Sequence, residues 1–154
     1  MTILGLASIL ADIPKPVRSR ITQRLAEILS PVAPVFVGLQ DGYAEELPRI
    51  YVTPGRETIE REYGYERRAS EYSVAIMVDV REYAEPEYEL VDRLIASISR
   101  VIAAPDEQMD SIIESITLTG TRPGYREDQG NMIGAELSYT ISYAADPADP
   151  DYAI

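Results

Sequence analysis

Alternation of apolar and polar residues is strongest near the end of the chain. Between residues 133 and 143 the apolar positions are Ile133, Ala135, Leu137, Tyr139, Ile141 and Tyr143. A period of two places successive side chains on opposite faces of a β-strand, so this stretch predicts a strand with one buried and one hydrated face. Residues 112–121 predict its antiparallel partner. The charged, glycine-containing loop between them, residues 123–131, is expected to project.

Three further strands are predicted upstream. Residues 71–81 alternate in the same way, with Val74, Ile76 and Val78 on the inner face. Two shorter apolar runs, residues 35–39 and 47–53, are each followed by a turn signal, Asp41-Gly42 and Pro54-Gly55 respectively. Proline and glycine at these points favour chain reversal and predict that both strands end there.

Helical spacing of apolar residues marks two main helices. Residues 16–29 and 86–104 both begin at a proline, which suits the first turn of a helix, and each carries an apolar stripe. A shorter helix over residues 2–11 places Ile3, Leu6, Ile9 and Leu10 on one side, before Pro14 and Pro16 interrupt it.

These elements predict an α+β fold, with a single mostly antiparallel β-sheet, two main helices packed on one face and a projecting β-hairpin arm. At 154 residues and 45% hydrophobic content, the chain suits one folded domain. We expect this domain to span residues 1–145, followed by an acidic, flexible C-terminal tail over residues 146–154.

The expected arm lies in residues 56–70, which are dense in Arg, Glu and Tyr without apolar periodicity, so we expect a surface feature and no core. The whole chain has 11 tyrosines, and Lys15 is the single lysine among 14 basic residues. Tyr and Arg are enriched at protein interfaces and Lys is depleted there, although the same composition also suits a solvated hairpin. The candidate interface residues are Arg56, Arg61, Tyr63, Tyr65, Arg67, Arg68, Arg122, Tyr125 and Arg126.

The net charge argues against a protein that binds nucleic acid. The pattern of apolar residues argues against a protein that crosses a membrane. The formal net charge is −12, from 26 acidic and 14 basic residues, so phosphates would be repelled. The apolar residues 3–13 lack a basic start and are too short to span a bilayer, so neither a signal peptide nor a transmembrane helix is expected.

Catalytic chemistry has few candidates in this sequence. Histidine and cysteine are absent, which removes the commonest proton-transfer group, the commonest metal ligand and the thiolate nucleophile. Acidic pairs such as Glu127-Asp128 lack the spacing of a calcium loop and are expected to solvate a face. We therefore expect no catalytic residue, no metal and no cofactor. A small carboxylate-dependent enzyme or metal-binding domain is the alternative from a different class.

The order of elements, together with residues 47–52, the strand over residues 116–121, the acidic pair Glu127-Asp128 and the closing strand over residues 135–143, resembles phage tail terminator proteins of the minor tail protein U-like family. This resemblance implies an α+β subunit that forms a ring, typically hexameric, at the head-proximal end of the tail tube. Such a ring ends tube polymerisation and provides the surface that joins the head. The family has no catalytic residues to carry over.

Partners follow from the same resemblance. They are further copies of the chain, the tail tube protein and a head–tail connector or neck protein, in a virion assembled in the host cytoplasm. DNA would pass through the ring without specific binding, which is consistent with an acidic subunit whose carboxylates face the lumen. Another neck or head-completion connector protein is the related alternative.

Overall fold

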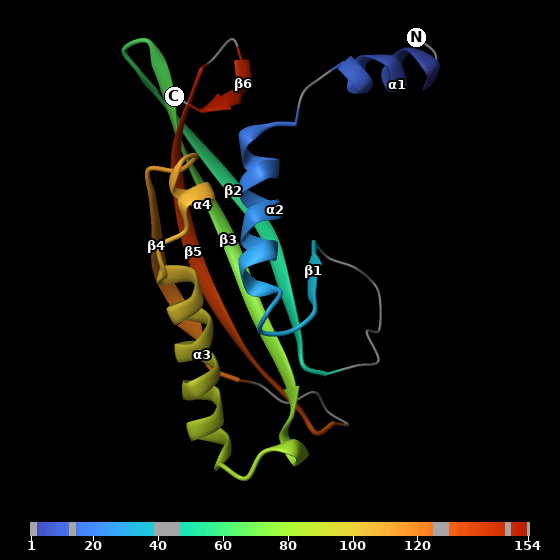
Figure 1. Cartoon of the computed structure of the whole chain (residues 1–154), viewed down its shortest axis with the longest axis vertical. Coiled ribbons are helices and arrows are strands. Elements are labelled where there is room, and N and C mark those ends of the chain that lie inside the picture. The colour runs from blue at the N-terminus through green and yellow to red at the C-terminus, as the bar shows by residue number, and fades with distance from the viewer. Residues whose placement is uncertain (1–2, 13–14, 39–46, 125–129, 147–148, 154) are drawn as a thin grey trace.

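A computed structural model describes residues 3–12, 15–38, 47–124, 130–146 and 149–153 of the chain (Figure 1). Helices α2 and α3 lie side by side on the same face of one long, twisted sheet, and the sheet's other face is not covered by a helix among the described residues. This arrangement confirms the α+β fold predicted from the sequence.

The sheet is mostly antiparallel, as predicted. Its strand order is β1-β2-β3-β5-β4, and only the β1–β2 pair is parallel. The strands along this path are β1 (Val35–Val37), β2 (Arg49–Glu62), β3 (Tyr65–Asp79), β4 (Ser115–Arg122) and β5 (Met132–Asp146).

The helices of the described ranges are α1 (Ile3–Asp12), α2 (Val17–Leu29), α3 (Glu87–Ala103) and the short α4 (Glu107–Asp110), and a 3-10 turn (Val80–Glu82) follows β3. Pro16 and Pro86 occupy the cap positions directly before α2 and α3, where their missing N–H groups leave no helical hydrogen bond unmade.

The core lies between the helices and the inner face of the sheet. Even-numbered residues of β3 pair in register with odd-numbered residues of β5. Val74, for example, pairs with Leu137, and both of these side chains are buried. Ile21 and Leu25 of α2 and Ile98 of α3 are completely buried as well. The apolar sets predicted from periods of two and 3.6 therefore form one continuous core.

Strand β2 is longer than predicted, because Pro54-Gly55 does not end it. The strand continues to Glu62, with a β-bulge between Pro54 and Glu57 that inserts one extra residue opposite β3. Parallel strand β1 pairs only with residues 50–52, so no described strand pairs with the outer edge of β2 beyond Val52, and a proline there removes no hydrogen bond on that side.

The sequence pattern also missed helix α4, whose start is capped. The Asp106 carboxylate accepts a hydrogen bond from the backbone N–H of Met109 at 2.8 Å and two from Arg24 of α2, at 2.7 and 2.9 Å. The Arg24 hydrogen bonds lower the pKa of Asp106 from 3.8 to about 2. One carboxylate therefore ties α4 to α2.

This contact predicts a pH dependence of stability. A depressed pKa means that Asp106 stabilises the fold fully above its unfolded value of 3.8, and that the contribution is lost as the pH falls toward 2. Asp106→Asn keeps the cap and removes the charge, so we expect it to unfold more easily than wild type at pH 6. The difference in urea-unfolding free energy should shrink between pH 4 and pH 2. A difference that stays constant down to pH 2 would contradict this role.

The acidic C-terminal segment contains a strand that the sequence pattern did not predict. Strand β6 (Asp149–Ala153) pairs antiparallel with the end of β5, with Ala153 opposite Ala145 and Asp149 opposite Asp146. The segment that was expected to be an extended tail thus returns along the sheet.

Candidate interaction site

The tip of the β2–β3 hairpin is the most exposed aromatic feature among the described residues. Glu62 pairs with Tyr65, so Tyr63 and Gly64 form a two-residue turn, and Gly64 has a φ of +88°, which glycine adopts without strain. The Tyr63 side chain is fully exposed. In Figure 1 this tip projects beyond α2, α3 and α4 at one end of the molecule, as predicted for the arm.

Arg67 braces the base of this tip on the open face of the sheet. Its guanidinium contacts Glu62 at 3.4 Å and Glu114, just before β4, at 3.0 Å. It also lies 5.9 Å from the ring centroid of Tyr65, within the range of a cation–π interaction. These contacts tie the hairpin to the start of β4 and fix Tyr65 beside the tip.

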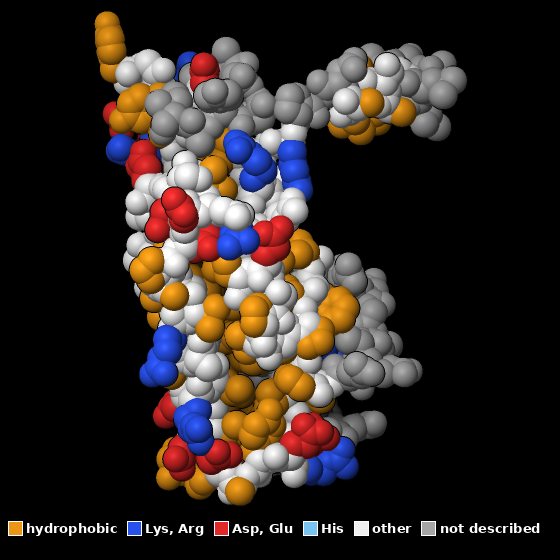
Figure 2. Space-filling model, viewed as in Figure 1, with side chains coloured by type: hydrophobic (Ala, Val, Ile, Leu, Met, Phe, Trp, Pro, Cys, Tyr) orange, Lys and Arg blue, Asp and Glu red, His pale blue; other side chains and the backbone are white. Residues whose placement is uncertain are grey.

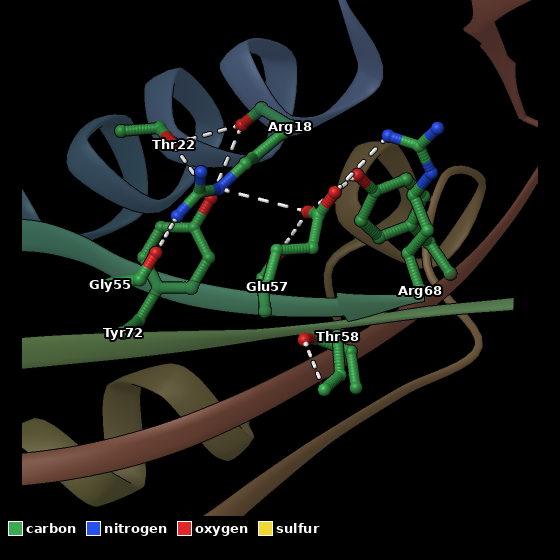
Figure 3. Close-up of polar contacts among 10 residues, drawn as sticks. Arg18, Thr22, Gly55, Glu57, Thr58, Arg68 and Tyr72 are labelled. Atoms are coloured by element: carbon green, nitrogen blue, oxygen red, sulfur yellow. Dashed lines mark hydrogen bonds and ion pairs between the residues drawn. The ribbon is translucent and has the colours of Figure 1, made fainter. Parts of the chain in front are cut away.

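Arg68 does not belong to this surface, which corrects the sequence-based expectation. It lies on the inner face of β3, where its guanidinium contacts Glu57 at 3.1 Å and Glu66 at 3.0 Å, and its side chain is only 19% exposed. Figure 3 shows Glu57 rising from β2 toward Arg68 and α2, whereas Thr58 points to the opposite face. Residues 56–70 therefore contribute a buried polar cluster as well as an exposed tip.

Glu57 is the centre of that cluster. It accepts hydrogen bonds from the hydroxyls of Tyr143, at 2.8 Å, and Ser70, and Arg18 of α2 lies 3.8 Å away. Burial pushes the pKa of Glu57 upward, but the hydrogen bonds from Ser70 and Tyr143 and the two guanidiniums outweigh it, so the pKa lies below its usual value. The carboxylate stays charged and partnered in a mostly dry setting.

Helix α2 joins the cluster to the bulge in β2. Arg18 donates a hydrogen bond to the Gly55 carbonyl, and the Tyr72 hydroxyl lies 2.7 Å from the Thr22 hydroxyl and 3.2 Å from the Arg18 carbonyl (Figure 3). Burial raises the pKa of Tyr72, so its hydroxyl stays protonated. The hydroxyls and the carboxylate of this cluster find their partners on other elements, which is typical of a structural network.

The remaining candidate residues separate into two places. Arg56 and Arg61 are exposed on β2. Arg61 lies near the hairpin tip with Tyr63, Tyr65 and Arg67, but its register partner is Glu66, so it lies on the opposite face of the hairpin from Arg67. Exposed Arg122, at the far end of β4, pairs in register with Glu136 and lies away from that tip. Tyr125 and Arg126, and with them most of the loop expected to project, lie outside the described residues.

The uncovered face of the sheet is a second candidate surface that the sequence reasoning did not single out. A shallow depression of about 550 Å³ on it is lined by hydroxyl-bearing residues from four strands and by Glu71. The hydroxyl-bearing residues on this face are Thr53, Ser73, Thr119, Ser138 and Thr140. The signal was present, since Ser73, Ser138 and Thr140 are polar positions that alternate with the core residues of β3 and β5.

The described part of the chain offers no group of three or more acidic side chains that could hold a metal ion. Nor does any helix in the described ranges combine the length and the apolar character that crossing a membrane requires. No protein-family model and no curated protein matches the chain. The features that stand out among the described residues are the exposed hairpin tip and the hydroxyl-lined depression.

Proposed function

We propose that this protein is a phage tail terminator, a virion protein that forms a ring at the head-proximal end of the tail tube, ends tube polymerisation and provides the surface that joins the head. The observation that carries the proposal is the β2–β3 hairpin. It presents Tyr63 and Arg61 to solvent beyond the domain body, on a base fixed by Arg67 and by the buried Glu57 cluster. A rigidly held, exposed aromatic and basic tip is typical of an interface anchor.

The fold also suits assembly into a ring. The hairpin projects at one end of an elongated domain, so it can reach a neighbouring subunit without disturbing the core (Figure 1). Repeated head-to-tail contacts of this kind close a ring when the rotation between subunits fits, and they leave two different ends. One end can then match the tube while the other accepts the head.

The distribution of charge supports passage of DNA rather than its binding. The chain carries a net charge of −12, and its partly buried arginines Arg18 and Arg68 are occupied by Glu57 and Glu66. Neutralised arginines contribute little attraction for phosphates. A ring of such subunits can enclose DNA without holding it.

The proposal predicts that Arg61→Ala combined with Tyr63→Ala abolishes termination and spares the fold. Both side chains are exposed, so the free energy of unfolding should change by less than about 0.5 kcal/mol. Ring formation, followed by mass photometry, should fail. Infected cells complemented with this variant should contain heads without joined tails, and tails of uncontrolled length.

Tyr88→Ala is the matched control, because Tyr88 is an exposed tyrosine on α3, far from the hairpin. It should leave rings and tails normal. If the double variant gives tails of normal length that remain unjoined to heads, the protein is another neck component and not the tail terminator. Normal rings and normal infectivity from the same variant would remove the hairpin from the interface.

A further inference from the structure

Helix α1 is an apolar helix that exposes its aliphatic side chains in the single subunit. Leu6, Ile9 and Leu10 are 53%, 48% and 60% exposed, and Figure 2 shows the helix standing clear of the body with hydrophobic side chains on its surface. Three exposed aliphatic side chains on a ten-residue helix are costly in water. Isolated helices of this length are also marginal, so a contact with another surface would stabilise α1.

A groove of matching character lies between α3 and β4. It has a volume of about 470 Å³ and is lined mainly by apolar atoms of Ala96, Ile102, Ala103, Ile116, Leu118 and Tyr139. Leu118 is 41% exposed along one wall. The Tyr139 hydroxyl is buried and has no hydrogen-bond partner among the described residues, and burial raises its pKa to about 12. This groove is therefore incompletely filled by the subunit itself.

Size and charge favour α1 as the occupant. Ala96 and Ala103 are seven residues apart on α3, about 10 Å along the helix, and their small side chains let a second helix approach closely. Helix α1, about 15 Å long, can cover that distance. Arg100 is the single charged residue of the lining, and α1 offers it the negative end of its helix dipole, with no basic residue in the last turn.

The groove that α1 can fill belongs to a different copy of the chain. In Figure 1, α1 extends from the start of α2 away from α3 and β4, with α2 between them. Pro16, directly before α2, has an extended backbone with φ of −60° and ψ of 155°, and its ring locks that φ. The chain therefore enters α2 through an extended residue, and α1 lies outward of its own α2 in Figure 1.

We propose that α1 of one copy docks into the α3–β4 groove of a second copy, so that each subunit gives a helix to one neighbour and receives a helix from another. The docking rests on the proposed function in one respect, since it requires self-association. It is independent of the hairpin, which uses other residues. Donation in one direction generates the head-to-tail contact that a ring repeats.

Cross-linking tests the docking directly, because the chain contains no cysteine. Full-length protein carrying Leu10→Cys is mixed with full-length protein carrying Ala103→Cys, and mild oxidant is added. A disulfide-linked dimer containing one chain of each type is expected on a non-reducing gel, since such a bond can form only between chains. Tyr88→Cys, exposed but away from the groove, replaces Ala103→Cys in the control and should give at least about tenfold less product.

The second measurement is the self-association of a variant that carries a charge in α1. Leu10→Glu places a carboxylate on the docking face without touching the core, and it should weaken self-association by about tenfold or more, while the melting temperature of the monomer stays unchanged. Ser8→Glu is the matched control on the same helix and should leave self-association within about twofold of wild type.

The outcomes separate the docking from the proposed function. Rings that form without the cross-link between positions 10 and 103, or that tolerate Leu10→Glu, overturn the docking and leave the terminator role intact. A third protein carries both cysteine substitutions in one chain. If it cross-links only within itself, α1 fills its own groove, and this also overturns the docking. Monomers at every concentration overturn both proposals.

Discussion

Replacing Glu57 by glutamine is expected to lower the free energy of unfolding by about 2–3 kcal/mol, although the two side chains have nearly the same shape. The Glu57 side chain is 13% exposed and faces the guanidiniums of Arg68 and Arg18. Glutamine at position 57 carries no charge, so the partly buried guanidiniums of Arg18 and Arg68 lose their negatively charged partner. The Tyr143 and Ser70 hydroxyls both donate hydrogen bonds to the Glu57 carboxylate. The NH₂ group of glutamine is itself a donor, so it cannot accept a hydrogen bond from either hydroxyl. Urea unfolding at pH 7 measures the effect.

Glu60→Gln is the matched control, because Glu60 is exposed on the same strand. It should change stability by less than about 0.5 kcal/mol. Equal effects of the two substitutions would show that the cluster gives the hairpin base no special stability. The comparison also tells a folding defect from an assembly defect, since Glu57 holds the arm and does not lie on its outer surface.

A methyl group at Gly124 is expected to cost about 1–3 kcal/mol of stability. Gly124 follows β4, and a Cβ there would overlap the backbone oxygen of Gly134 and lie 2.9 Å from a methyl of Val91 and 2.8 Å from Ile133. The Gly134 carbonyl and the side chains of Ile133 and Val91 cannot all move away, because they are held in β5 and α3. Gly124→Ala should therefore lower the melting temperature, measured by circular dichroism.

Gly120→Ala is the matching control within the same segment. A Cβ at Gly120 meets no atom within 4 Å, so this substitution should be nearly neutral or slightly stabilising. A Gly124→Ala protein as stable as the Gly120→Ala protein would mean that Gly124 does not pack against β5 and α3 as closely as described.

The layers of the fold followed directly from apolar spacing. The period of two in β3 and β5, and the period of 3.6 in α2 and α3, predicted the inner faces that the structure buries, including Val74, Leu137 and Ile98. Strand β6 was not predicted, because its five residues, three of them Asp-Pro-Asp, carry no apolar period. It is defined by its pairing with the end of β5.

The hairpin was predicted, but its inward side was not. Glu66, Arg68 and Ser70 have the same parity as Val74 along β3, so extending the alternation backward would have placed Arg68 inside. On β2, extending the alternation forward from Ile50 and Val52 does not identify the inward residues beyond Pro54. The bulge after Pro54 inserts one residue and changes the parity, which turns Glu57 inward in place of Arg56. Sequence spacing does not reveal a bulge, so the pairing of Arg68 with Glu57 could be found only in the structure.

Both rims of the sheet are built in a way that resists aggregation. Beyond the three residues covered by β1, the rim of β2 carries Pro54, the bulge and the charged run Glu60-Arg61-Glu62. At the opposite rim, the pairing of β4 with β5 shifts register between Leu118 and Gly120. The proline and the charged run on β2, together with the register shift in each of the two outer strand pairs, oppose the strand-to-strand stacking that leads to amyloid-like fibres. Any contact between copies of this chain is thus left to exposed side chains rather than to open strand edges.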